Sequence, residues 1–268
     1  MAIIIEEVDV SRRDTYHDRI VALEAGVEYP LGDDHFEICH GENYYAFFDR
    51  LGSLNPFIAL SGNDVIAMGS GILRSIPRQR NADQEAVWYI CDLKVRSDHR
   101  KKHLPWRLFA HAFPRKYPKC SRGYGISMNP PGEQVNPVVS IASHFNLISI
   151  RTQQLWLHSL NATEMIRAEK TLCDHLGPLS YLSVANTKDI VLKSTGKSWP
   201  LLHVQHGPCA QHGARTPIEG HVHMFCLPDN DVIHHSLAES GWMPSATATI
   251  ISHRMANWDW RFILTSDI

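Results

Sequence analysis

Residues 93–108 read LKVRSDHRKKHLPWRL, the end of a predicted strand, a short basic loop and the first turns of a predicted helix. Residues 86–95 are rich in Val, Ile and aromatic residues, which favours a strand, and apolar residues recur at helical spacing over 104–113. The backbone amides at the start of a helix lack intrahelical partners and point outward, and the helix dipole favours anions there. Residues 100–102 add three consecutive cations. This stretch therefore predicts a site for a phosphate-bearing ligand.

The patterns on both sides of this stretch alternate between strands and helices. The predicted elements are a strand at 3–10, helices at 14–26 and 42–51, a hairpin over 56–76, a strand at 123–128, a helix at 137–145 and a strand at 149–157. With the strand and helix of the basic stretch, the order is β-α-α-β-β-β-α-β-α-β. This order indicates an α/β protein with a mixed α+β sheet.

In this order, the strand, loop and helix resemble motif A of the GCN5-related N-acetyltransferase (GNAT) superfamily, in which a strand leads into Q/R-x-x-G-x-G/A at the start of a helix. The positions on the pattern are Leu93, Val95, Arg100, Leu104 and Leu108. His103 and Pro105 stand where the family has two small residues. Glycine lets a backbone approach pyrophosphate closely, so His103 narrows the site or donates an imidazole hydrogen bond instead, and Pro105 removes one amide donor. The resemblance covers roughly residues 3–157.

The resemblance implies a GNAT-like acyl-CoA N-acyltransferase fold over 1–157, followed by a smaller α+β domain over 158–268. It implies acetyl-CoA as the co-substrate, and transfer of its acetyl group, or another acyl group, to a primary amine of a small cationic molecule or a lysine side chain. The residues assigned to the co-substrate are Leu93, Lys94, Val95, Arg100, Lys101, Lys102, His103, Leu104, Pro105 and Asn136. Asn136 also fits a plain N-cap before Pro137.

The implied reaction needs a base, because an ammonium must lose a proton before its nitrogen attacks the thioester. Asp92 stands where some polyamine-directed members carry an acidic residue, and it is our first choice. The alternative is a strand carboxylate that pairs with Lys94 or Arg96. Tyr89 is a second candidate, although a phenol with a pKa of about 10 is a poor base at neutral pH.

The leaving thiolate must gain a proton, and the family usually supplies it from a tyrosine in the helix after the fifth strand. The matching helix at 137–145 has no tyrosine. Ser143 and His144 are the nearest replacements, and imidazole donates protons near neutral pH. The alternative for His144 is an ordinary histidine at a helix end.

Charge is unevenly distributed along the chain. Residues 1–50 hold twelve Asp and Glu against four Arg, whereas residues 94–122 hold ten Lys and Arg against a single Asp. If these segments face each other across a cleft, the basic side suits a polyanion and the acidic side suits a cationic acceptor. The alternative is that both are solvated faces.

The second half repeats part of the first. A helix at 161–175 leads into predicted strands at 179–185, 189–192 and 201–205. The tail then has a strand at 221–227, a helix at 229–240 and strands at 246–253 and 260–264. The order of strand, helix and strand in this tail is the same as in residues 123–157. This similarity predicts an internal duplication in which the second half is a degenerate GNAT-like repeat.

A histidine and cysteine series in the second half suggests another chemistry. It reads His203-x2-His206-x2-Cys209-x2-His212, followed by His221-x-His223-x2-Cys226. Imidazole and thiolate are ligands that zinc prefers. The spacing matches no zinc motif that we can name, so we expect no metal and assign these residues to a polar loop and strands. A metal-binding protein centred on His203–Cys226 stays an alternative, and a non-catalytic acyl-CoA-binding or interaction module is another.

Composition narrows the class of protein. The chain has 268 residues, 44% of them hydrophobic, and a net charge of −2, which indicates a packed globular protein without a bulk preference for nucleic acid. Its apolar runs are far shorter than the ~20 residues of a membrane span, so we expect no membrane partner. The six cysteines are far apart, and the N-terminus lacks a basic signal-peptide region. We therefore expect reduced cysteines and a cytoplasmic location, and a homodimer stays open.

Overall fold

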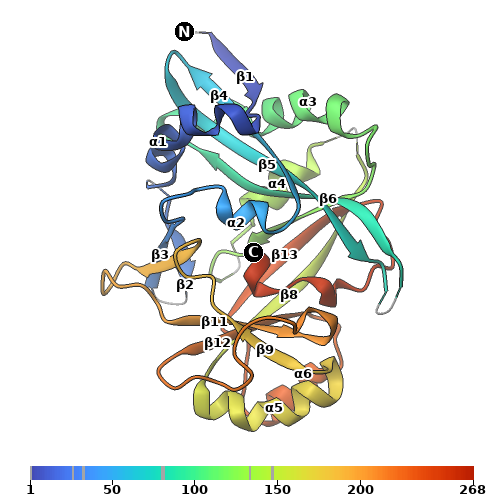
Figure 1. Ribbon diagram of the computed structural model, residues 1–268. Coiled ribbons are helices and arrows are strands. Elements are labelled where there is room, and N and C mark those ends of the chain that lie inside the picture. The colour runs from blue at the N-terminus through green and yellow to red at the C-terminus, as the bar shows by residue number, and fades with distance from the viewer. Residues whose placement is uncertain (1, 26, 32–33, 80–81, 133, 146–147) are drawn as a thin grey trace.

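A ten-stranded mixed sheet runs through the molecule from end to end (Figure 1). The computed structural model describes residues 2–25, 27–31, 34–79, 82–132, 134–145 and 148–268. Within them, the strand order of the large sheet is β1-β4-β5-β6-β7-β13-β8-β12-β11-β9. The mixed α/β class predicted from the sequence is confirmed.

The first half of the chain supplies the upper part of the sheet in Figure 1. In chain order, its helices and sheet strands are β1 (Ile3–Glu7), α1 (Arg13–Glu24), α2 (Ala46–Asp49), β4 (Ser53–Ser61), β5 (Asp64–Pro77), β6 (Gln84–Val95), α3 (Leu104–Lys116), β7 (Gly123–Met128), α4 (Pro137–Ser143) and β8 (Ile150–Asn161). This is the predicted order. The sequence did not reveal a further hairpin between α1 and α2, formed by β2 (Tyr29–Leu31) and β3 (Asp34–Cys39).

The second half supplies the lower part. Its elements are α5 (Ala162–Leu176), β9 (Leu179–Leu182), β10 (Asp189–Leu192), β11 (Leu201–His206), β12 (Val222–Pro228), α6 (Ile233–Glu239) and β13 (Ala246–His253). Helix α5 starts with a capping box in which Asn161 and Glu164 satisfy each other's backbone amides. Strand β10 lies outside the large sheet. It pairs with β3 in a small sheet and so connects the second half to the first.

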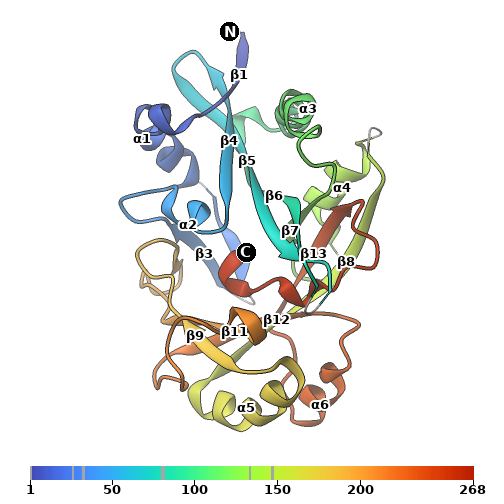
Figure 2. The same ribbon diagram turned by 45° about the vertical axis from the view of Figure 1, so that its right-hand side comes forward.

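Helices cover both faces of the upper sheet. Helices α1 and α2 lie on one face, and α3 and α4 lie on the other (Figure 2). Apolar residues of α1 and of the segment around α2 pack with the sheet residues Ile72, Tyr89 and Tyr124 in one continuous core. Leu104 and Leu108 of α3 pack on the opposite face. The alternation of side chains along each strand thus separates two environments.

Strands β6 and β7 are parallel and form a fork. Trp88–Ile90 pair with Gly123–Gly125, and beyond that point β6 continues along β5 while β7 pairs with β13. The same arrangement occurs in the second half, where the parallel strands β11 and β12 pair only over Leu201–His203 and Val222–Met224. Each half therefore contains one parallel pair that opens after three residues.

The two halves exchange strands at the centre of the sheet. Strand β13 of the second half pairs with β7 of the first, and β8 of the first half pairs with β12 of the second. Strands β13 and β8 pair with each other, so β6-β7-β13 and β8-β12-β11 mirror one another in order. The units β7-α4-β8 and β12-α6-β13 are the two segments whose similarity the sequence suggested. This topology confirms the predicted internal duplication.

One predicted strand is wrong. Residues 260–264 do not form a strand, because both edges of β13 are already occupied by β7 and β8. Instead, the Asp259 carboxylate accepts a hydrogen bond from the Arg261 amide and starts a 3₁₀ turn over Trp260–Phe262. The tail then runs back to the centre of the molecule, where Ile268 lies (Figures 1 and 2). Among the described residues, no helix combines the length and the apolar character needed to cross a membrane.

Candidate functional site

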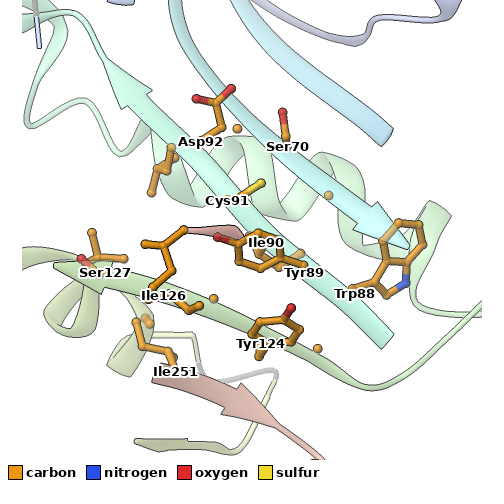
Figure 3. Close-up of a pocket in the computed structure, with 18 of the residues that line it drawn as sticks. Ser70, Trp88, Tyr89, Ile90, Cys91, Asp92, Tyr124, Ile126, Ser127 and Ile251 are labelled. Atoms are coloured by element: carbon orange, nitrogen blue, oxygen red, sulfur yellow. The ribbon is translucent and has the colours of Figure 1, made fainter. Parts of the chain in front are cut away.

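A cavity of about 510 Å³ lies at the fork of β6 and β7 (Figure 3). Strands β5, β6 and β7 and the helices α3 and α4 line it from the first half. Lys188, Trp199 and His203 line it from the second half. The cavity thus reaches both faces of the sheet, and both repeats contribute to its wall.

Strand β6 carries an extra residue at the open part of the fork. Cys91 lies opposite Ser70, but Lys94 lies opposite Met68, so three residues of β6 span two of β5. The insertion is a β-bulge, and Asp92 within it has the left-handed φ of 59°. Asp92 and Lys94 therefore point to the α1 face, and Leu93 points to the α3 face beside Gly69.

The bulge brings Asp92 into a buried charge network. Lys94 forms ion pairs with Asp92 and with Glu24 of α1, and the side chains of Lys94 and Asp92 are 3% and 2% exposed. The Tyr44 hydroxyl lies 2.8 Å and 2.9 Å from the two Asp92 oxygens, and it accepts a hydrogen bond of 2.8 Å from Lys94. This is the pairing with Lys94 that the sequence left open as the alternative for Asp92. Its role as the base stays a prediction.

Burial shapes the pKa values around this network. Burial alone would lower the pKa of Lys94, but the carboxylates of Asp92 and Glu24 outweigh it and hold that pKa above its usual value. Burial raises the pKa of Glu24, against the opposing effect of Lys94. Tyr44 has a pKa well above its usual value because it is buried beside Asp92 and Glu24. The network therefore lies on the α1 side of the sheet, and within it Glu24 Oε1 is buried without a hydrogen-bond partner among the described residues.

Tyr89 lies below the network, inside the core. It stacks on Tyr124 with the ring centroids 4.9 Å apart, and burial raises its pKa well above 10. A phenol held neutral in this way takes no proton from an amine near neutral pH. The arrangement adds to the chemical objection already raised against Tyr89 as the base.

The basic loop between β6 and α3 keeps the backbone conformation of a glycine loop without glycine. A 3₁₀ turn over Ser97–His99 leads into the loop, in which Lys101 and His103 have φ values of 64° and 55°. L-residues rarely adopt this left-handed conformation, and glycine adopts it freely. His103 therefore stands at the N-cap of α3 in a conformation that glycine would adopt without steric cost.

The charges of this loop are available to a ligand. Arg100, Lys101 and Lys102 are exposed, and none of them forms an ion pair with any residue that the structure describes. The neighbouring Arg96, by contrast, is held by Asp64 and Asp98. Pro105, in the first turn of α3, lines the cavity. The phosphate site predicted from the sequence thus has the exposed charge and the helix start it requires.

The residues predicted around α4 lie elsewhere. The Asn136 side chain accepts hydrogen bonds from the amides of Val138 and Val139 and donates to the backbone of β7, so it acts as an N-cap that ties α4 to the sheet. Ser143 and His144 are exposed and bond to the Ser140 carbonyl at the end of α4. Neither lines the cavity, in contrast to Phe145. The contact of Asn136 with CoA and the acid role of Ser143 or His144 stay predictions.

Sequence reasoning missed three residues that line the cavity: Lys188, His40 and His203. Lys188 is half-buried with its ammonium 4.5 Å from the centroid of the Phe47 ring, and this burial, assisted by Lys94, lowers its pKa to about 8. His40 contacts the Thr187 carbonyl through Nδ1, and burial lowers its pKa to about 3. Both residues are distant from the fork in sequence, and no local pattern marks them.

His203 is the third residue that sequence reasoning missed at this site. Its Nδ1 lies 3.0 Å from the hydroxyl of Thr265, which donates to the Met224 carbonyl. The hydroxyl proton is engaged, so Nδ1 carries the imidazole proton and Nε2 is an acceptor. Burial lowers the pKa of His203 to about 3.

The rest of the histidine and cysteine series is distributed over the second half. His223 accepts a hydrogen bond from the Ile218 amide, and the buried Cys226 thiol bonds to the Ile263 carbonyl. His206 ends β11, and Cys209 belongs to the 3₁₀ turn that follows it. In the described part of the chain, no three His, Cys, Asp or Glu side chains are grouped so that they would hold a metal ion.

Comparison with solved structures identifies the fold. A tandem GNAT protein from the clavulanic acid biosynthesis pathway superposes on the chain with a TM-score of 0.53 at 10% sequence identity, covering 95% of this chain and 99% of that one. An aminoglycoside acetyltransferase from a soil metagenomic sample covers 56% of this chain and 93% of its own, with a TM-score of 0.38 and 12% identity. The chain therefore has the two-repeat GNAT fold that the first likeness defines.

Comparison at the level of sequence adds a viral relative. An uncharacterised protein of Acanthamoeba polyphaga mimivirus is 24% identical over 234 residues, which are 84% of this chain and 68% of the relative. No family model matches the chain.

Proposed function

We propose that this protein transfers an acyl group from acyl-CoA to a primary amine. The observation that carries the proposal is the coincidence of the β6–β7 fork with the exposed, unpaired cations at the start of α3. A fork offers strand backbone to an extended amide chain, and the basic helix start offers charge to phosphate. CoA combines these two chemistries in one molecule.

In the proposed complex, the pyrophosphate lies against Arg100, Lys101, Lys102 and the amides around His103. Beyond Ile90, β6 has no ladder partner on the β7 side among the described residues, so the backbone of Asp92–Lys94 is open to hydrogen bonds with pantetheine amides. The thioester then lies near the bulge at Asp92. In this arrangement, strand β6, the loop after it and the start of α3 make all of these contacts with CoA.

The transfer we propose is a direct attack. The amine nitrogen forms a bond to the acyl carbon as the carbon–sulfur bond breaks, and the amine proton leaves while the thiolate gains one. We keep Asp92 as the proposed base, with a water between its carboxylate and the amine, because Asp92 lines the cavity although Lys94 and Tyr44 hold it. The acid is proposed to be water at the open mouth, since Ser143 and His144 lie outside the cavity.

We further propose a division of roles along the chain. Residues 1–157 hold acyl-CoA, and residues 158–268 close the acceptor end of the cavity through Lys188, Trp199 and His203. The acceptor is a small amine, for which the buried carboxylates of Glu24 and Asp92 provide local negative charge. A cytoplasmic location and a homodimer stay predictions.

A second candidate function is acyl-CoA binding without turnover. The observation that favours it is the network around Asp92, whose carboxylate is already bonded to Lys94 and Tyr44. A carboxylate whose oxygens already bond to an ammonium and a hydroxyl has fewer free positions for a water or an amine. Both candidates use the same binding site and differ only in chemistry.

Two measurements test the proposal. Thermal unfolding with added CoA and acetyl-CoA should give a higher melting temperature, because a ligand that binds only the folded state stabilises it. Release of free thiol from acetyl-CoA, measured with polyamines, amino sugars and lysine peptides, should then identify an acceptor. Stabilisation without thiol release from any amine favours the second candidate, and no stabilisation by CoA contradicts both.

A further inference from the structure

The sheet face below α3 and α4 has few side chains at the fork, where Trp88, Ile90 and Leu93 of β6 stand among glycines of the neighbouring strands. Four glycines of β5 and β7 lie on this face and line the cavity: Gly69, Gly71, Gly123 and Gly125. A Cβ atom at Gly125 would lie 3.0 Å from the Ile90 carbonyl oxygen, and one at Gly123 would lie 3.2 Å from that of Trp88. The close spacing of the strands thus favours glycine over larger residues in β7, and the absence of side chains at these positions leaves space above the strand.

Ile90 shows how open this face is. It stands in β6 between β5 and β7, near the middle of the large sheet, yet it is 44% exposed and lines the cavity. A central strand residue is normally covered by a packed layer. Here the covering layer stands off and leaves a chamber above Ile90.

The opposite wall of the chamber is a layer of aromatic rings. Phe145, which follows α4, stacks on Phe109 and Trp106 of α3 with centroid distances of 4.5 Å and 4.8 Å. Phe113 and Ile141 also line the cavity. The chamber therefore lies between the glycines of β5 and β7 on the sheet, which form its floor, and the aromatic side chains of α3 and Phe145.

The charged and polar residues at the far end of the chamber are only partly engaged, because Arg122 Nε and His253 Nε2 are buried without a hydrogen-bond partner among the described residues. Lys116 donates to Glu7 and to Asn55 at 2.6 Å and 2.7 Å, and Arg122 pairs with Glu85 at 2.7 Å. His253 contacts the Ser149 carbonyl. An occupant of the chamber therefore meets mainly apolar walls, with two unpartnered polar atoms at the far end.

The backbone at the floor is engaged as well. Trp88–Ile90 and Gly123–Gly125 form the paired part of the fork, so their amides and carbonyls serve the ladder. A pantetheine arm carries amides that need hydrogen bonds, and burial without them costs free energy. A hydrocarbon chain needs none, which makes it the better occupant of this chamber.

We propose that the acyl group carried by CoA is a hydrocarbon chain longer than acetyl, which enters this chamber from the thioester at the fork. The inference rests on the proposed function and names its donor substrate class. Each methylene that leaves water for the chamber adds binding free energy, until the chamber is filled.

The test is a series of affinities for CoA, acetyl-CoA and the butanoyl, hexanoyl, octanoyl and decanoyl thioesters, measured by titration calorimetry. We expect affinity to rise by up to about fourfold per added methylene and then to level off. Affinity that stays flat from acetyl onward, with CoA itself bound, overturns the inference and leaves the proposed function standing. Absence of binding by CoA and by every thioester overturns both.

Two substitutions of Ile90 test whether the hydrocarbon chain of the acyl group lies in this chamber. In Ile90→Trp the larger side chain fills the chamber, so affinity for acyl-CoA should no longer rise with the length of the acyl chain. In Ile90→Ala the chamber is larger, so affinity should continue to rise up to a longer acyl chain before it levels off. The matched control is Ile166→Trp on the exposed face of α5, where Ile166 is 59% exposed, and it should keep the wild-type dependence. Thermal unfolding without ligand checks that each variant folds. An unchanged dependence in both Ile90 variants overturns the placement.

Discussion

Tyr89 and Lys94 lie five residues apart on β6, and their side chains point to the same face of the sheet. In a regular strand an odd separation places two side chains on opposite faces. The extra residue at Asp92 shifts the alternation, so Lys94 reaches Glu24 and Tyr44 on the α1 face. The bulge thereby places the Asp92–Lys94 pair on the α1 face and Leu93 on the α3 face.

The first prediction concerns the basic loop. Arg100→Ala with Lys101→Ala removes two exposed charges at the start of α3, and each direct bond to phosphate is worth about 1–3 kcal/mol. CoA affinity should therefore fall by at least about tenfold, measured by calorimetry. The matched control is Lys170→Ala on the exposed surface of α5, which should leave CoA affinity unchanged. Unchanged affinity in the double variant would place the phosphates elsewhere.

The second prediction concerns the left-handed N-cap of α3. His103→Gly removes the steric cost of φ 55°, which is about 1 kcal/mol for an L-residue. Measured by urea denaturation, His103→Gly should exceed His103→Ala in stability by about that amount. CoA affinity of the glycine variant should equal or exceed the wild-type value. A large loss of affinity in His103→Gly alone would instead make the imidazole a phosphate donor.

The third prediction concerns the Asp92–Lys94 pair. A double-mutant cycle with Asp92→Asn and Lys94→Gln should give a coupling energy of about 1–3 kcal/mol, because the two groups are bonded and buried. If Asp92 is also the base, acyl transfer by Asp92→Asn should fall by ~10²-fold or more while acyl-CoA affinity is retained. Turnover within a few-fold of wild type would confine Asp92 to the structural role. Additive stability changes would contradict the buried pair.

The fourth prediction concerns the dependence of stability on pH. Burial above all, with nearby cations, lowers the pKa values of His40 and His203 to about 3, whereas an unfolded histidine titrates near its ordinary 6.5. Below pH 6.5 the unfolded state binds more protons. The contribution to stability is therefore complete above pH 6.5 and is lost as the pH falls towards 3, by at most about 1.4 kcal/mol per unit for each histidine.

Urea denaturation between pH 7.5 and 5 measures this loss, because ordinary carboxylates contribute little in that interval. His203→Gln removes one of several such groups, because burial also lowers the pKa of His158 to about 4, and it should reduce the slope by at most about 1.4 kcal/mol per pH unit. His235→Gln is the control, since His235 is exposed on α6. Equal slopes in wild type and His203→Gln would show that His203 takes up a proton in the folded state.

The fifth prediction concerns metal. Dialysis against a chelator should leave the melting temperature and CoA affinity unchanged, because His203, His223 and Cys226 bond to protein partners. Elemental analysis before and after dialysis provides the comparison. Stoichiometric zinc that is released together with loss of the fold would establish the metal-binding alternative.

Three features were predictable from the sequence: the α/β class, the basic strand–loop–helix unit, and the similar element order of residues 123–157 and 221–253. Each depends on patterns within about fifteen residues: a β-prone run at 86–95, an amphipathic helix from Leu104, consecutive cations at 100–102 and strand–helix–strand periodicity around 123–157 and 221–253. Local periodicity decides whether a segment becomes a helix or a strand, so these features are visible without the fold. The strand predicted at 260–264 failed because its outcome depended on whether an edge of β13 was free.

The composition of the site was decided by tertiary structure alone. The exchange of β8 and β13 brings Lys188 and His203 to a cavity whose centre is formed near residue 90, about a hundred residues earlier in the chain. The bulge at Asp92 selects the face on which Lys94 lies, and the pairing of β7 with β6 decides that Gly123 and Gly125 form the floor of a chamber. Strand pairing over long separations has no local signature, because the hydrogen bonds that join two strands are the same whatever the sequence between them.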